Sequence, residues 1–113
     1  MTISERKTGD VVIVDVSGKV TLGDGGDAML KDKMSSLVQA GQKKVLLNLA
    51  EVSYVDSAGL GAIVQAYATL SKNGGALKLL NMTKRLNDLL VLTKLATIFD
   101  SHENEKAALD SFS

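Results

Sequence analysis

The sequence contains no cysteine, which excludes disulfide bonds and thiolate chemistry. No apolar stretch approaches the roughly 20 residues of a membrane-spanning helix, and the polar segment 1–10 has no secretory hydrophobic region. Aromatic residues make up only 4% of the chain, and 13 basic residues balance 13 acidic ones. Nucleic-acid binders usually carry a basic excess and aromatic side chains on which bases stack. These absences favour a cytoplasmic protein that contacts neither a membrane nor a nucleic acid.

The length and the apolar content indicate one folded unit. A chain of 113 residues with 45% hydrophobic residues can bury one core and is too short for two ordinary domains. It has no internal repeat, low-complexity tract or linker. We therefore predict a single domain over residues 1–113.

Alternating strand and helix patterns predict the fold class. Apolar, β-branched runs predict buried strands over 11–16, 44–49 and 76–82, and shorter strands over 3–7 and 96–100. Helical periodicity predicts helices over 28–40, from Ser57 to Asn73, after Thr83, and over 103–112, with Asp27 as the first N-cap. The first two strands should be antiparallel and the later ones parallel. The expected fold is α/β, with a mixed, mostly parallel sheet of four to five strands and about four helices packed mainly on one face.

The segment Tyr54-Val55-Asp56-Ser57-Ala58-Gly59-Leu60-Gly61 is the most informative motif in the chain. It lies between a buried strand and a helix, so Ser57 is expected as the N-cap or first residue of that helix. A hydroxyl there is exposed, held by first-turn N–H groups and close to the positive end of the helix dipole. The two glycines allow another backbone or a phosphate to approach. This position suits the addition and removal of a phosphate group.

Plainer readings of these residues remain open. One is that Asp56 and Ser57 serve only as helix caps, which are common at such positions. A nucleophilic serine would need a base within reach, but the single histidine, His102, is expected near the start of the last helix. The run Gly23-Asp24-Gly25-Gly26-Asp27 lacks the P-loop ending and the EF-hand spacing, so a turn is expected there and no metal site.

The motif resembles the signature of STAS domains, the family that contains bacterial anti-sigma-factor antagonists. The order of predicted elements and the chain length agree with that resemblance. It implies that Ser57 is phosphorylated by a partner that is both an anti-sigma factor and a serine kinase. The unphosphorylated form would bind this partner and free the sigma factor, and phosphorylation would break the complex. A PP2C-type phosphatase would reverse the modification.

The resemblance also implies a non-enzymatic protein, a monomer or weak dimer, without a cofactor of its own, since ATP and magnesium belong to the kinase. Residues expected at the partner surface lie in the motif and in the loop before the first helix: Asp56, Ser57, Ala58, Gly59, Leu60, Gly61, Thr21 and Asp24. Lys84 and Arg85 are peripheral candidates. Thr21 and Asn48 stand where close relatives often carry acidic residues.

Two other functions remain as alternatives. The chain could be a STAS interaction module of a signalling scaffold, or a soluble subunit of a lipid or anion transporter, without a phosphorylation switch. It could also be a small enzyme that uses Ser57. Finally, five leucines between residues 86 and 95 exceed what one buried face requires; most are expected in the core, and some at an interface.

Overall fold

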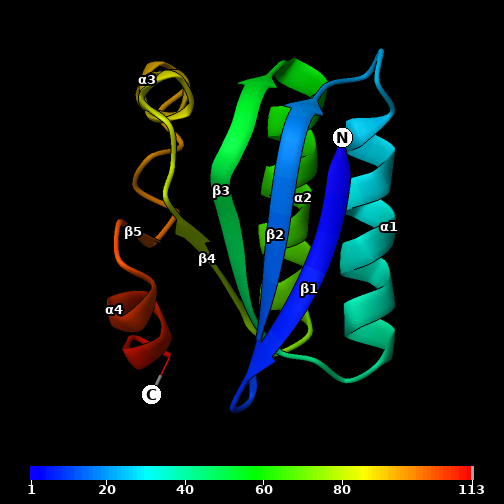
Figure 1. Ribbon diagram of the computed structural model, residues 1–113, viewed down its shortest axis with the longest axis vertical. Coiled ribbons are helices and arrows are strands. Elements are labelled where there is room, and N and C mark those ends of the chain that lie inside the picture. The colour runs from blue at the N-terminus through cyan, green and yellow to red at the C-terminus, as the bar shows by residue number, and fades with distance from the viewer. Residues whose placement is uncertain (113) are drawn as a thin grey trace.

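Strands and helices alternate along most of the chain. The computed structural model describes residues 1–112. The elements are, in order, β1 (Thr2–Thr8), β2 (Val11–Val20), α1 (Gly26–Gln39), β3 (Lys44–Val55), α2 (Ser57–Lys72), β4 (Ala76–Leu80), α3 (Lys84–Leu92), β5 (Ser101–His102) and α4 (Glu105–Asp110). The strands form one sheet with α1 and α2 behind it, as Figure 1 shows.

The sheet has five strands in the order β1-β2-β3-β4-β5. β1 is antiparallel to β2, because a tight turn joins them, and every other neighbouring pair is parallel. The carboxyl ends of β2 and β3 therefore meet at the same edge. The predicted fold class, a mixed and mostly parallel sheet with helices, is confirmed.

The central strands are apolar on both faces. On β2, Val12, Val14 and Val16 face the main core beneath α1, α2 and α3, whereas Val11 and Ile13 belong to a second, smaller cluster. That second cluster is covered by Ala108 of α4 and the residues after it. Three helices thus cover one face and the short α4 covers part of the other, as predicted.

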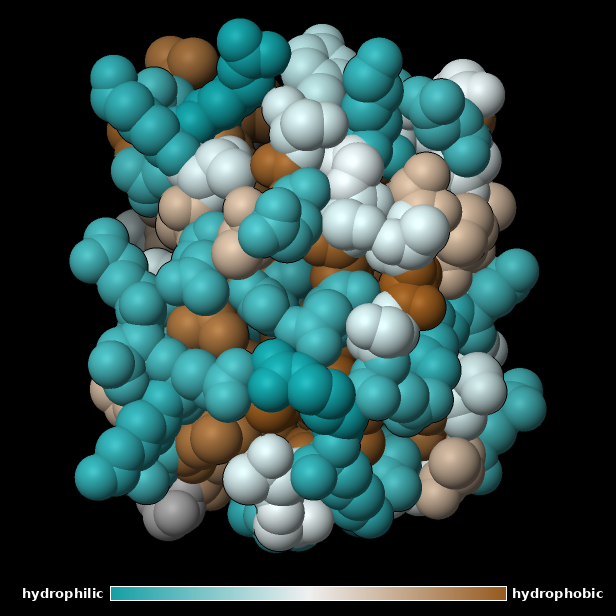
Figure 2. Space-filling model, in the orientation of Figure 1, coloured by the Kyte–Doolittle hydropathy of each residue, from teal (hydrophilic) through white to brown (hydrophobic). Residues whose placement is uncertain are grey.

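The face opposite α1 and α2 is mostly hydrophilic where α4 does not cover it (Figure 2). A series of polar side-chain contacts crosses this face from strand to strand. Arg6 on β1 binds Asp15 on β2 at 2.7 Å, and the Asn48 side-chain amide on β3 donates to Asp15 at 2.7 Å. Arg6 also reaches Glu105 at 2.8 Å, which fastens α4 to the edge of the sheet.

Several details of the predicted elements are wrong. The strand predicted over 11–16 continues to Val20, through Gly18 with a φ of 90° beside a register shift. The strand predicted over 44–49 continues to Val55, and the one predicted over 76–82 ends at Leu80. The first helix begins at Gly26 with Gly25 as N-cap, and Asp27 lies buried in its first turn. The segment 96–100 is not a strand, because it turns back after α3 and places Phe99 in the core, edge-to-face on Tyr67. The last helix is shorter than predicted, with Asn104 as its cap.

Within the described chain, no helix combines the length and the apolar character required to cross a membrane.

Candidate functional site

Asp56 connects the two loops at the carboxyl edge of the sheet. It is the N-cap of α2: its Oδ1 accepts a hydrogen bond from the backbone N–H of Gly59 at 2.8 Å. Its Oδ2 accepts another from the N–H of Leu22, in the loop between β2 and α1, at 3.1 Å. These two N–H donors lower the pKa of the Asp56 carboxyl below its ordinary value. The carboxylate is therefore charged at neutral pH and fixes one loop against the other.

Ser57 is the first residue of α2, and its side chain is exposed. The exposure agrees with what the sequence predicted. The expectation that first-turn N–H groups hold the hydroxyl is wrong, because the preceding Asp56 accepts the hydrogen bond from the first turn. The Ser57 hydroxyl thus lies at the positive end of a 16-residue helix and does not carry out the capping.

The next four residues divide between core and surface. Gly59 and Leu60 are buried, Ala58 is half-buried and Gly61 is exposed. A Cβ atom on Gly59 would come within 1.9 Å of the Val20 carbonyl oxygen at the end of β2, whereas one on Gly61 would meet nothing within 4 Å. Gly59 therefore lets α2 pack closely against β2, and the Leu60 side chain packs in the main core. Their predicted place at a partner surface can only be indirect, through the position of Ser57.

Thr21 and Asp24 form a small polar turn in the loop between β2 and α1. The Thr21 hydroxyl donates to the Asp24 carboxylate at 2.7 Å, and the Asp24 N–H donates back to that hydroxyl at 3.3 Å. Thr21 is only 8% exposed, so it orders the loop and presents little surface itself. Asp24 is exposed on the same edge of the sheet as Ser57.

Sequence reasoning missed Leu22. Its side chain is 68% exposed, while its backbone N–H is held by Asp56. No motif marks it, but a leucine between a buried strand and a Gly/Asp-rich turn has no predicted core contact, and that was the available signal.

Asn48, one of the two positions where relatives were expected to carry an acidic residue, lies in the middle of β3, away from Ser57. Its amide donates to Asp15, and its Oδ1 accepts from Asn81 at 3.4 Å and from the Ala50 N–H at 3.2 Å. Asp15 already supplies a carboxylate here, and Arg6 is the main cause of the lowered pKa of that carboxyl. An amide at position 48 avoids a second negative charge beside it.

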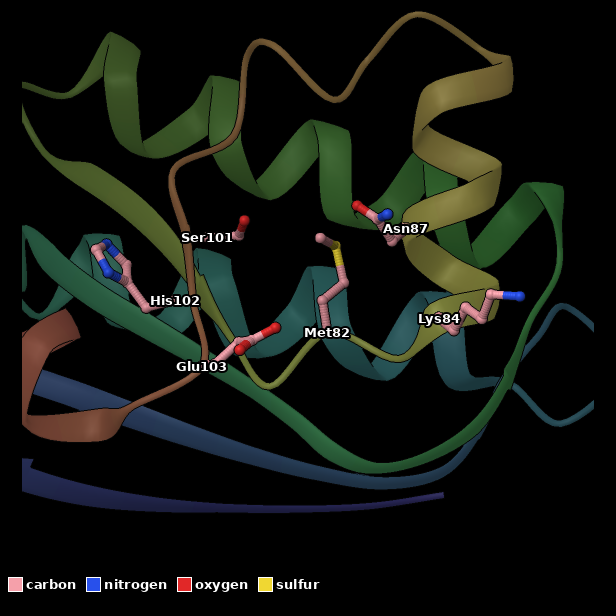
Figure 3. A pocket seen from close by; sticks show the side chains of 6 residues that line it. All are labelled: Met82, Lys84, Asn87, Ser101, His102 and Glu103. Atoms are coloured by element: carbon pink, nitrogen blue, oxygen red, sulfur yellow. The ribbon is translucent and has the colours of Figure 1, made fainter.

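A cavity of about 490 Å³ lies between the start of α3 and the carboxyl ends of β4 and β5. In Figure 3 the Ser101, Asn87 and Met82 side chains point toward it, whereas the His102 ring points to the other side of its strand. His102 instead contacts the Asp100 carboxylate at 3.1 Å. His102 lies in β5, three residues before α4, near the start of the last helix as predicted. Ser101 and His102 both line the cavity, but the His102 ring is directed away from the Ser101 side chain (Figure 3), so the two do not form a serine–histidine pair.

No group of three His, Cys, Asp or Glu side chains among residues 1–112 could hold a metal ion. The Gly/Asp-rich segment 23–27 forms the turn before α1 and the first two residues of that helix, as its composition indicated.

Comparison with known proteins agrees with this architecture. The model of the STAS domain family matches residues 2–108, and the chain belongs to that family. It is 30% identical over 100 residues to the anti-sigma-B factor antagonist of Bacillus subtilis, covering 88% of this chain and 89% of the relative.

Two solved structures share the fold. A Thermotoga maritima protein, provisionally assigned as an anti-sigma factor antagonist, superposes with a TM-score of 0.89 at 23% identity, over 97% of this chain and 93% of its own. The Bacillus cell fate determinant SpoIIAA in its phosphorylated form superposes with a TM-score of 0.77 at 18% identity, over 99% of this chain and 100% of its own.

Proposed function

We propose that this chain is an anti-sigma-factor antagonist that changes partners through phosphorylation of Ser57. The unphosphorylated form binds an anti-sigma factor that is also a serine kinase and thereby frees the sigma factor. Phosphorylation of Ser57 abolishes that binding, and a PP2C-type phosphatase restores it. The exposed hydroxyl at the start of α2, set on the rigid Asp56 connection, is the observation that carries the proposal. The name of the Bacillus subtilis relative supports it.

The site explains how one phosphate can end binding without unfolding the domain. A phosphate on Ser57 adds about 1.5 to 2 negative charges. The helix N-terminus stabilises those charges through its dipole and free N–H groups, so the domain tolerates them. A partner surface that fits the neutral Ser57 hydroxyl would instead meet the added bulk and the added negative charge of the phosphate. That SpoIIAA was solved in both forms agrees with a fold that accommodates the phosphate.

In this proposal the chain has no catalytic activity of its own. Ser57 is the substrate of the partner's kinase, and the ATP and magnesium are held by that partner. Covalent labelling of Ser57 by a fluorophosphonate would contradict this, because it would show a serine activated as a nucleophile.

The test uses the purified protein, a candidate anti-sigma factor/kinase and ATP with magnesium. Mass spectrometry should show one added phosphate on Ser57, absent in Ser57→Ala and retained in the control Ser53→Ala, which changes another exposed serine nearby. In binding assays Ser57→Ala should hold the kinase permanently and Ser57→Asp should not bind. If both Ser57 variants bound the kinase as the parent does, the proposed switch would be wrong, and a STAS module without a phosphorylation cycle would remain.

A further inference from the structure

An apolar groove lies beside the proposed site, between the end of β3 and α3. Its volume is about 670 Å³, and its apolar lining consists of Tyr54, Val55, Leu89 and Leu92. Its polar lining consists of Lys84, Arg85 and Asp88. We call it the α3 groove. Tyr54 and Val55 directly precede Asp56 and Ser57, so the groove and the serine belong to one continuous surface.

The apolar side chains of this groove exceed what the core requires. α3 turns Leu86 and Leu90 into the core, but Leu92 is 80% exposed and Tyr54 is 42% exposed. Apolar atoms also show in Figure 2 at the corner where α3 lies. Adjacent exposed apolar side chains with polar neighbours are typical of a surface that another protein covers.

The charges of the groove indicate what kind of segment covers it. Among residues 1–112, Lys84 and Arg85 form no ion pair, as is also true of several other surface lysines. The Arg85 guanidinium lies over the Tyr54 ring at 5.6 Å from its centroid, which leaves its N–H donors available. Two free cations against the single carboxylate of Asp88 favour an acidic ligand.

The ends of the parallel strands place these features together. In Figure 1 the β2–α1 loop, the start of α2 and α3 lie along the same end of the molecule. The β2–α1 loop, which carries the exposed Leu22, lies on one side of the start of α2, and α3 lies on the other (Figure 1). The α3 groove therefore lies at the same end of the molecule as the start of α2, where the partner would bind.

We propose that the α3 groove is a second docking site for the same anti-sigma partner, which inserts an amphipathic segment with an apolar side chain and a carboxylate. The apolar side chain packs between Leu89, Leu92 and Tyr54, and the carboxylate binds Arg85. This inference rests on the proposed function for the identity of the partner. It adds that the affinity of the unphosphorylated form comes from two places, the surface around Ser57 and the α3 groove.

The experiment measures, by calorimetry, the affinity of this protein for the kinase that phosphorylates Ser57. Leu92→Ser and Arg85→Glu should each weaken binding about tenfold, the effect of removing a central interface residue. The matched controls are Val91→Ser and Lys94→Glu, which change exposed residues next to the groove that do not line it. They should leave affinity within about twofold. All four variants should keep the parent's denaturation midpoint, because the side chains are exposed.

The outcomes separate the two proposals. If Ser57→Asp prevents binding while Leu92→Ser and Arg85→Glu bind like their controls, the groove is not a docking site and the proposed function stands. If Ser57→Asp binds like the parent, the proposed function is wrong, whatever the groove variants do. If Leu92→Ser changes the oligomeric state in light scattering but not kinase affinity, the occupant is a second copy of the chain and this inference is overturned.

Discussion

Gly59 and Gly61 lie two residues apart in the first turns of α2, and the same substitution should affect them in opposite directions. A Cβ atom at Gly59 would stand 1.9 Å from the Val20 carbonyl oxygen, and 2.9 Å from its carbonyl carbon. Both contacts are with backbone, which cannot rotate away as a side chain can. A Cβ atom at Gly61 would meet nothing within 4 Å.

The sizes of the two effects follow from this geometry. At Gly59→Ala the clash should cost about 3 kcal/mol, the upper end for overpacking, and the better helix propensity of alanine returns about 1 kcal/mol. The net loss of unfolding free energy is about 2 kcal/mol. At Gly61→Ala only the propensity gain of about 1 kcal/mol remains.

Urea denaturation followed by circular dichroism measures both variants. With a slope of about 1–3 kcal/mol per molar for a domain of this size, Gly59→Ala should lower the midpoint by roughly 1 M and Gly61→Ala should raise it by roughly 0.5 M. A midpoint that rose in both variants would show that α2 does not pack on the end of β2 as described. The positioning of Ser57 by Gly59 would then be refuted as well.

Three further predictions concern the rest of the chain. Arg6 lowers the pKa of the Asp15 carboxyl in the folded protein. Such a carboxylate stabilises the fold above its unfolded pKa of about 3.9, and the stabilisation is lost as the pH falls through the lowered folded pKa. Asp15→Asn should therefore flatten the decline of unfolding free energy below about pH 4. Asn48→Asp should cost about 1–2 kcal/mol at pH 7, because it replaces a 2.7 Å hydrogen bond with a second carboxylate beside Asp15, and the cost should shrink in denaturation curves taken near pH 4; an equal cost at both pH values would contradict the charge argument. Thr83→Ala removes the hydroxyl that accepts from the Leu86 N–H at 3.2 Å, so thermal unfolding should show a loss of about 1 kcal/mol, and a stability equal to the parent's would show that this cap contributes nothing.

Local sequence signals predicted the elements whose pattern is strong. The apolar runs of β2 and β3 and the helical stripe of α2 appear where expected, because side-chain periodicity and turn residues act within a few positions. The prediction of a strand over 96–100 is wrong because the apolar residues of this segment lie in a turn, from which Phe99 packs on Tyr67 of α2. That contact joins residues 32 positions apart and leaves no local signal.

The sequence by itself determined the fold class, the place of Ser57 between a buried strand and a helix, and the exposure of its hydroxyl. Only the tertiary structure decided which residues of the motif reach the surface, because burial of Gly59 and Leu60 depends on how closely α2 approaches β2. It also decided that Asp56 holds the β2–α1 loop through the Leu22 N–H, a contact across 34 positions that exists only when the ends of two parallel strands meet. The α3 groove has the same origin, since its walls come from segments that the sheet brings together.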